Sequence, residues 1–282
     1  MERILSESVN RRFRKGEAFT IIEVLVVITI IGLLASIVLI TTKGARERAK
    51  IAKSLNFAAQ VHHSLGAYAV GIWDFDDQVN PTADASGYDN HGTIIGAIFT
   101  ADTPSGKGYA LDFTGNDYVE IASNKSLNPG TDPLTIEVWF KMNAVGALNG
   151  SILYNKENLY EASAGGGYFT YAWQPHWAWD GGTSFPVKVG EWYHVVVTYD
   201  HVNQYVYKNG QLVYSRPQAG NIGTDTNALR IGARGAPGVA SSLFNGLIDD
   251  VRIYEEALNS AQIKKLYVEG AREKGLVVKI KN

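Results

Sequence analysis

The chain has 282 residues, with 26 lysines and arginines against 28 aspartates and glutamates and a formal net charge of −2. This balance excludes a dedicated binder of nucleic acid or another polyanion, because no excess of basic residues would concentrate the chain on phosphate. A hydrophobic fraction of 45% is ample for a folded core. The absence of cysteine excludes disulfides, zinc–thiolate sites and a cysteine nucleophile.

An apolar segment follows a basic leader at the N-terminus. Residues 1–18 end in a cluster of arginines and a lysine, and residues 19–40 carry one charge, Glu23. As a helix this segment would be about 33 Å long, which is enough to cross the hydrocarbon core of a bilayer. Small apolar residues then recur at helical spacing, so a continuous helix is predicted over 19–70, with 19–40 spanning the membrane.

Glu23 lies four residues inside the apolar segment, where an unpaired carboxylate is costly. In one interpretation it sits at the headgroup boundary and reaches water. The other interpretation rests on the whole N-terminal sequence, which has a basic leader, a small residue, the string FTIIE and then an apolar run. This order of features resembles the class III signal of type IV pilins and type II secretion pseudopilins. The resemblance implies that a prepilin peptidase cleaves between Ala18 and Phe19 and methylates Phe19. It further implies that Glu23 acts in assembly with other pilin or pseudopilin subunits.

The cleavage site departs from the usual pattern of that family. The family normally has glycine before the scissile bond, whereas here Gly16 is followed by Glu17 and Ala18. Cutting after Gly16 would place Glu23 at the seventh mature position instead of the fifth. Cleavage after Ala18 is therefore preferred, with Gly16 as the alternative.

From residue 71 the pattern changes to short alternating runs separated by turn residues, which predicts many strands without intervening helices. Asn209-Gly210 between two such runs indicates a tight type I′ hairpin. These strands predict an antiparallel sandwich or jelly roll. A last helix is predicted over 257–270, capped by Asn259 or Ser260. The predicted strands cover residues 71–75, 92–99, 109–113, 117–122, 134–142, 151–156, 166–175, 192–200, 204–215, 228–233 and 242–255.

Six motifs in this region, in order, resemble the concanavalin A-like, laminin G-type jelly roll. They read GIWDFDD, DASGYDNHG, YALDFTGNDYVEIA, LTIEVWFK, GEWYHVVVTYD and FNGLIDDVRIYEEALNSAQIKKLY. The resemblance covers 71–268 and implies a ligand-binding, often glycan-binding, domain. The expected organisation is a leader (1–18), a pilin-like helix (19–70), a mostly β jelly roll (71–268) and a C-terminal tail (269–282).

Many members of that family carry one structural calcium ion, which takes six to eight oxygen ligands. The resemblance places the ligands at Asp76, Asp117 and Asp249, together with the Gly115 carbonyl. In the alternative interpretation, Asp249 pairs with Arg252 or Arg230, or caps a turn.

An aromatic cluster is the expected ligand-binding surface. Its predicted contacts are Tyr171, Trp173, His176, Trp177 and Trp179, because exposed indoles stack on the apolar faces of sugar rings. In the alternative interpretation these aromatic residues fill the sandwich or its rim. Three other tryptophans lie in strand motifs shared with the fold and are expected in the core: Trp73, Trp139 and Trp192.

Catalysis is not expected. Laminarinase-like glucanases of the same fold use two glutamates flanking an aspartate on one strand, whereas the corresponding strand here carries Glu137 alone. Glycoside hydrolysis needs two carboxylates facing the cleft. A glycoside hydrolase is therefore the weakest of the three functions considered.

The favoured function is a pilin-like subunit in the cytoplasmic membrane, spanning it once and displaying its head outside the cytoplasm. After cleavage it would enter an extracellular or periplasmic filament, and the head would bind a glycan or surface polymer. The alternative is a signal-anchored surface lectin that never polymerises.

Overall fold

The computed structural model describes residues 20–33, 65–175, 185–235 and 240–272. The chain divides into two compact units, Met1–Phe57 and Ala58–Asn282. In the first unit a helix runs over 21–33. Within the described ranges, no helix reaches the length and apolarity needed to cross a membrane. The predicted span 19–40 is described only in part, so it stays a prediction.

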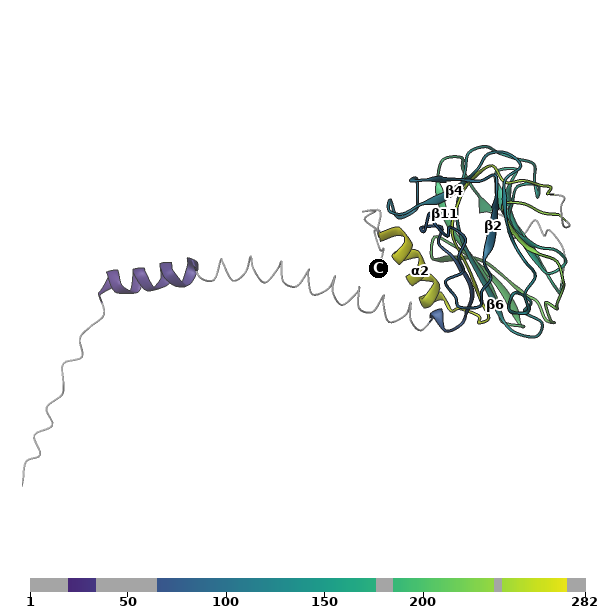
Figure 1. Cartoon of the computed structure of the whole chain (residues 1–282). Coiled ribbons are helices and arrows are strands. Elements are labelled where there is room, and N and C mark those ends of the chain that lie inside the picture. The colour runs from purple at the N-terminus through teal and green to yellow at the C-terminus, as the bar shows by residue number, and fades with distance from the viewer. Residues whose placement is uncertain (1–19, 34–64, 176–184, 236–239, 273–282) are drawn as a thin grey trace, which may run out of the picture. The chain divides into compact units, whose positions relative to one another are not determined.

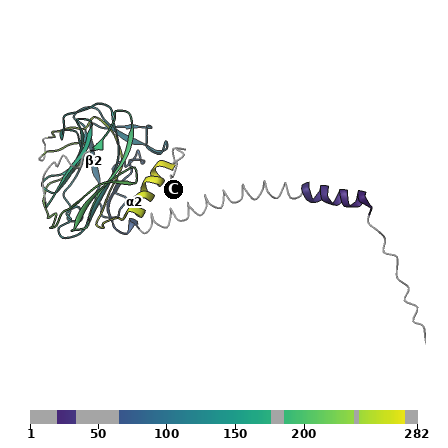
Figure 2. The ribbon, with the colours of Figure 1, turned by 180° about the vertical axis from the view of Figure 1, so that it is seen from behind.

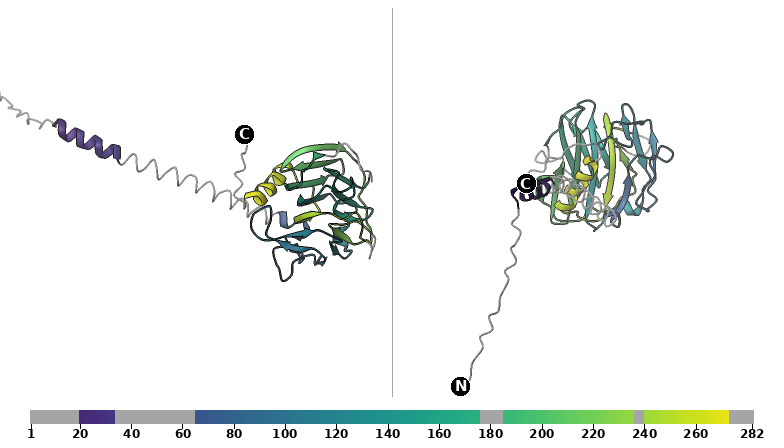
Figure 3. Two further views of the ribbon diagram at one scale, coloured as in Figure 1. Left: turned by 90° about the horizontal axis from the view of Figure 1, so that it is seen from above. Right: turned by 90° about the vertical axis from the view of Figure 1, so that its left-hand side faces the viewer.

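The second unit is an antiparallel β-sandwich, and the predicted fold class is confirmed. Its two sheets lie face to face (Figure 3). The eight-stranded sheet, sheet A, has the order β13-β12-β11-β6-β15-β4-β3, and β1 pairs with β15. Its strands are β1 (Ala69–Trp73), β3 (Ile98–Thr100), β4 (Ala110–Phe113), β6 (Leu134–Met142), β11 (Trp192–Tyr199), β12 (Asn203–Lys208), β13 (Gln211–Pro217) and β15 (Gly246–Tyr254).

The seven-stranded sheet, sheet B, has the order β10-β9-β8-β7-β14-β5-β2. A short 3-10 helix, η1 (Lys125–Leu127), follows β5. The strands of this sheet are β2 (Gly92–Ile95), β5 (Tyr118–Ile121), β7 (Ile152–Lys156), β8 (Tyr160–Gly165), β9 (Tyr168–Trp173), β10 (Phe185–Pro186) and β14 (Leu229–Ile231). The sequence patterns did not predict β8 or β10, because β8 mixes small and polar residues and β10 has only two.

The main core lies between the sheets and follows the alternation of each strand. On β6, for example, Ile136, Val138 and Phe140 enter the core, while the residues between them face the opposite side. That opposite side is also covered, since eight of the nine residues of β6 are buried. A polar residue on the outer face of β6 is therefore removed from water.

Helix α2 (Ser260–Arg272) provides this cover. It lies along the outside of the sandwich (Figures 1 and 2), and Ile263 and Leu266 pack with Val196 and Tyr207 of sheet A in a second apolar cluster. Asn259 caps the helix as predicted: its Oδ1 accepts hydrogen bonds from the backbone N–H groups of Ala261 and Gln262. The Gln262 side chain in turn accepts from the Asn259 N–H, which completes a capping box.

Strand β15 changes partner half way along its length. Gly246–Ile248 pair with β4, whereas Val251–Tyr254 pair with β1. The register shifts between Asp249 and Arg252, and Asp250 has a φ of 48°. The two adjacent acids thus occupy a β-bulge, which bends a strand and re-aims its side chains.

Two turns show how individual residues set strand ends. Asn209 and Gly210 have φ values of 51° and 73°, which confirms the predicted type I′ hairpin between β12 and β13. The predicted strand 92–99 is instead broken into β2 and β3 at Gly96. That residue has a φ of 84°, and a Cβ there would lie 2.1 Å from Asp117 Oδ1.

Candidate functional site

The N-terminal helix begins with a local polar motif. Thr20 donates to Glu23 Oε2 from both its backbone N–H and its hydroxyl, each at 2.9 Å, and the Glu23 N–H donates to Thr20 Oγ1 at 3.3 Å. This is a capping box, which satisfies N–H groups that have no partner at the first turn of a helix. Of the predicted N-terminal site residues, Glu23 is described, whereas Ala18 and Phe19 lie outside the described residues.

The structure describes two residues of the predicted aromatic surface, and both lie in the core. Tyr171 and Trp173 are core residues, 1% and 0% exposed; the Tyr171 hydroxyl donates to Gln204 Oε1 and Trp173 packs on Tyr160. These two rings cannot offer a face to a sugar, because they alternate inward on β9. For them the alternative interpretation holds and the binding prediction is wrong. His176, Trp177 and Trp179 lie outside the described residues.

The predicted calcium ligands are engaged in hydrogen bonds to the backbone. Asp117 Oδ2 accepts from the N–H groups of Thr114 and Gly115, both at 2.8 Å. Asp76 Oδ1 accepts from the Tyr109 N–H at 2.7 Å, and Asp249 Oδ1 accepts from the Asp250 N–H at 2.8 Å. These contacts fix loops and the β15 bulge.

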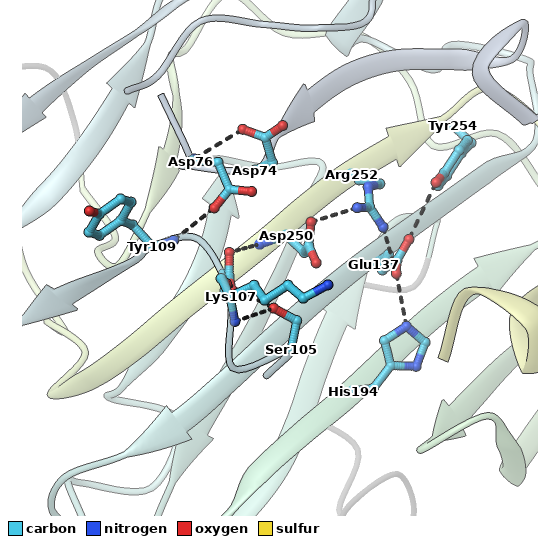
Figure 4. Close-up of polar contacts among 11 residues, drawn as sticks. Asp74, Asp76, Ser105, Lys107, Tyr109, Glu137, His194, Asp250, Arg252 and Tyr254 are labelled. Carbon is cyan, nitrogen blue, oxygen red and sulfur yellow. Dashed lines mark hydrogen bonds and ion pairs between the residues drawn. The ribbon is translucent and has the colours of Figure 1, made fainter. Parts of the chain in front are cut away.

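Asp249 and Asp250 occupy an unfavourable environment for charge. Burial raises the pKa of Asp249 well above its usual range, and the nearby carboxylates of Asp250 and Asp76 raise it further. Burial also raises the pKa of Asp250 to about 6, against the attraction of the Arg252 guanidinium. It is Asp250, not Asp249, that pairs with Arg252 (Figure 4).

The four predicted ligands do not fit one calcium ion in this arrangement. Within the described part of the chain, no group of three histidine or carboxylate side chains is placed to hold a metal. Asp76 acts electrostatically on Asp249, whereas Asp117 acts on Asp112. Calcium binding by this chain stays a prediction.

Glu137, on the outer face of β6, is a buried charge with three side-chain partners. Its side chain is fully buried, and it accepts from His194 Nε2 at 2.9 Å, Arg252 Nη1 at 3.2 Å and the Tyr254 hydroxyl at 3.3 Å (Figure 4). Burial alone would raise the pKa of Glu137, but Arg252 and His194 outweigh it and lower that pKa. The carboxylate is thus held ionised and unavailable to a substrate.

Sheet B carries a second set of ion pairs, each with one buried and one partly exposed partner, which the sequence patterns did not indicate. Arg234 binds both oxygens of Glu161, at 2.7 and 2.8 Å, and Arg230 binds Glu120 through two nitrogens. Burial raises the pKa of Glu161, opposed by Arg234. A carboxylate held by a guanidinium in this way suits structural pairing better than proton transfer to a substrate.

Comparison with known proteins identifies both parts of the chain. Residues 113–264, more than half of the chain, match the concanavalin A-like lectin/glucanases superfamily, and residues 14–39 match the prokaryotic N-terminal methylation motif. The chain therefore belongs to the concanavalin A-like lectin/glucanases superfamily. No curated protein sequence matches it.

Solved structures with the same fold are mostly binding domains. The binding domain of Paraclostridial Mosquitocidal Protein 1 has a TM-score of 0.56 and 16% identity, over 73% of this chain and 53% of that one. Domain 4 of AbnA, a GH43 extracellular arabinanase from Geobacillus stearothermophilus solved with arabinotriose, has a TM-score of 0.55 and 20% identity, over 71% and 98%. A botulinum neurotoxin type C structure, concerned with cell entry through two ganglioside molecules, has a TM-score of 0.58 and 14% identity, over 74% and 53%.

These likenesses establish the fold. The chain spans about half the length of the mosquitocidal protein and neurotoxin structures, and nearly all of the arabinanase domain.

Removing the carboxylate of Glu137 should destabilise the head strongly. Glu137→Ala leaves the Arg252 guanidinium without this partner in a buried site, so we expect a loss of about 3 kcal/mol or more in the free energy of unfolding. Denaturant unfolding of the full-length chain in detergent, followed by tryptophan fluorescence, measures it. The exposed Glu255→Ala is the matched control and should change stability by less than about 0.5 kcal/mol. Equal effects of the two variants would contradict a central role for Glu137.

The raised pKa of Asp250 predicts a pH-dependent stability. The folded state holds this proton more tightly than the unfolded chain, so the stabilisation is present below about pH 4 and is lost as the pH rises through about 6. Asp250→Asn removes the titration and suits the left-handed conformation. Relative to this variant, the free energy of unfolding of the unmodified protein should fall by on the order of 2 kcal/mol between pH 4 and 7. The measurement is denaturant unfolding of both proteins across that range in chelator-containing buffer. An equal pH dependence of the free energy of unfolding in the two proteins would contradict the assignment.

Proposed function

We propose that the chain is a type IV pilin-like or pseudopilin-like subunit of the cytoplasmic membrane that displays a lectin-like head outside the cytoplasm. The observation that carries the proposal is the N-terminal methylation motif at 14–39 ahead of a sandwich whose structural neighbours are mostly binding domains. A prepilin peptidase is the expected processing partner, and other pilin or pseudopilin subunits are the expected assembly partners.

The surface of the N-terminal helix supports this proposal. Apolar side chains are exposed on every side of it; among them are Ile21, Ile28, Ile31 and Leu33, each more than half exposed. A helix that is hydrophobic all round is stable only when lipid or other helices cover it. The Thr20–Glu23 capping box satisfies polar groups that would otherwise be costly in such surroundings.

The head supports a binding function over a catalytic one. The carboxylate that corresponds to the glucanase catalytic strand, Glu137, is buried and paired with Arg252 and His194. The arabinanase domain with the same fold was solved with arabinotriose, and the neurotoxin structure concerns gangliosides. A glycan is therefore the proposed ligand class.

Processing by prepilin peptidase is the first test. The full chain is co-expressed in membranes with a prepilin peptidase, and its intact mass and N-terminal sequence are measured. We expect a mature chain that begins with methylated Phe19. A chain that starts after Gly16 would support the alternative cleavage site, whereas an uncut terminus would contradict the pilin pathway and favour the signal-anchored lectin.

Replacement of Glu23 separates a filament subunit from a tethered lectin. Glu23→Gln keeps a carbonyl oxygen for the capping box but removes the charge, so the helix should persist while filament assembly is lost. Shearing and sedimentation of filaments, or cross-linking between subunits, measures assembly. The matched control is Thr29→Val in the same helix, which should assemble normally because the Thr29 hydroxyl donates to the Val26 carbonyl of its own helical turn. Unchanged assembly of Glu23→Gln would contradict the assigned role.

A further inference from the structure

A pocket of about 340 Å³ lies at the C-terminal end of α2, on the outer face of sheet A. Its walls include Trp139 of β6, Trp192 of β11 and Tyr267 of α2, and its polar rim includes Glu191 and Asn209. The volume is within the range of small-molecule sites, about 300–1,000 Å³. The sequence motifs assigned both tryptophans to the core. Trp192 is instead only partly buried. Trp139 is buried as expected, but beneath α2 and not between the sheets.

The aromatic walls are held in place by further contacts. The ring of Tyr267 stacks on that of Trp139, with a centroid distance of 5.8 Å and an interplanar angle of 19°. Trp192 Nε1 donates to Asp102 Oδ1 at 2.9 Å, and Lys141, which pairs with Asp102, lies 5.6 Å from the Trp192 ring centroid. Rings fixed in this way lose little conformational entropy when a ligand stacks on them.

One polar atom of the wall has no hydrogen-bond partner. Trp139 is 3% exposed, and its Nε1 lacks an acceptor among the described residues. A buried indole N–H without an acceptor is costly. Gly270 packs directly against this indole, because a Cβ at Gly270 would lie 2.9 Å from Nε1 and 2.8 Å from the indole Cζ2. Trp139 is therefore a covered part of the wall, and Trp192, which is only partly buried, is the indole that a ligand can reach.

We propose that this pocket binds one unit of a neutral glycan. A pyranose or furanose ring offers an apolar C–H face for the Trp192 indole and the Tyr267 phenol ring, and hydroxyls that can donate to the Glu191 carboxylate. Glu191, the charged residue among those that line the pocket, disfavours an acidic sugar, whereas Asp102 is neutralised by its pair with Lys141. The inference rests on the proposed glycan-binding function of the head and names its site.

Binding of saccharides to the full-length chain in detergent tests the pocket. The probes are arabinotriose, cellotetraose and maltotetraose, with an oligogalacturonate as the acidic comparison, and affinities come from titration calorimetry. We expect at least one neutral probe to bind and the acidic probe to bind at least about tenfold more weakly. Comparable or tighter binding of the acidic probe would overturn the neutral-glycan assignment.

Variants locate the site. Trp192→Ala removes one wall, and Gly270→Ala displaces the Trp139 indole on which Tyr267 stacks. Each should weaken binding of the neutral probe at least about tenfold. Tyr168→Ala, which removes an exposed aromatic residue on sheet B, is the matched control and should bind like the unmodified chain. Thermal unfolding confirms that each variant is folded.

Two outcomes would overturn the inference and can be told apart. If Trp192→Ala and Gly270→Ala bind normally while a Trp177→Ala/Trp179→Ala double variant does not, the head is a lectin whose site lies elsewhere. If the unmodified chain binds none of the probes, both the proposed glycan-binding function of the head and the proposed site are contradicted. Processing at Phe19 is tested by a separate experiment.

Discussion

The buried carboxylate of Glu137 is the constraint around which the outer face of sheet A is organised. An ionised group removed from water is tolerated only when opposite charge and hydrogen bonds replace the lost hydration. Here Arg252, His194 and Tyr254 supply them from two neighbouring strands. Because each partner lies on a different register position of β11 or β15, the network fixes how those strands align with β6.

The same network explains the β15 bulge. Arg252 must reach both Glu137 and Asp250, and the register shift between Asp249 and Arg252 places Asp250 in a left-handed conformation that makes this possible. The cost is two adjacent carboxylates in a poorly hydrated site, which raises the pKa of both. The bulge also lets β15 pair with β4 on one side of the kink and with β1 beyond it.

Local signals in the sequence predicted local structure well. Asn209-Gly210 set the hairpin and Asn259 set the start of α2, because each feature depends on a few residues that are close in the chain. The family motifs predicted the sandwich, because alternation identifies strands wherever one face enters the core.

The site was harder to predict, because it depends on contacts between residues far apart in the chain. Alternation cannot say which side of β9 is the interior, so Tyr171 and Trp173 were assigned to a surface although they are core residues. It also cannot show that α2 covers the outer face of sheet A. That cover places Trp139 against Tyr267 and leaves Trp192 at the margin. Asp249 was expected to be a metal ligand, and this role stays a prediction; alternation could not show that the bulge directs its Oδ1 to the Asp250 N–H.

The two units differ in how their apolar side chains are removed from water. The sandwich buries its apolar side chains within itself, between its sheets and beneath α2, so its outer surface is free to carry polar rims and a pocket. The N-terminal helix exposes apolar side chains all round, and a helix of this kind is stable only when lipid or other helices cover it. In the proposed subunit, the helix therefore anchors or assembles the protein while the head keeps one binding surface in either state. The capping box satisfies the first turn of the helix locally, and in the proposed assembly the Glu23 charge is the feature that a neighbouring subunit recognises.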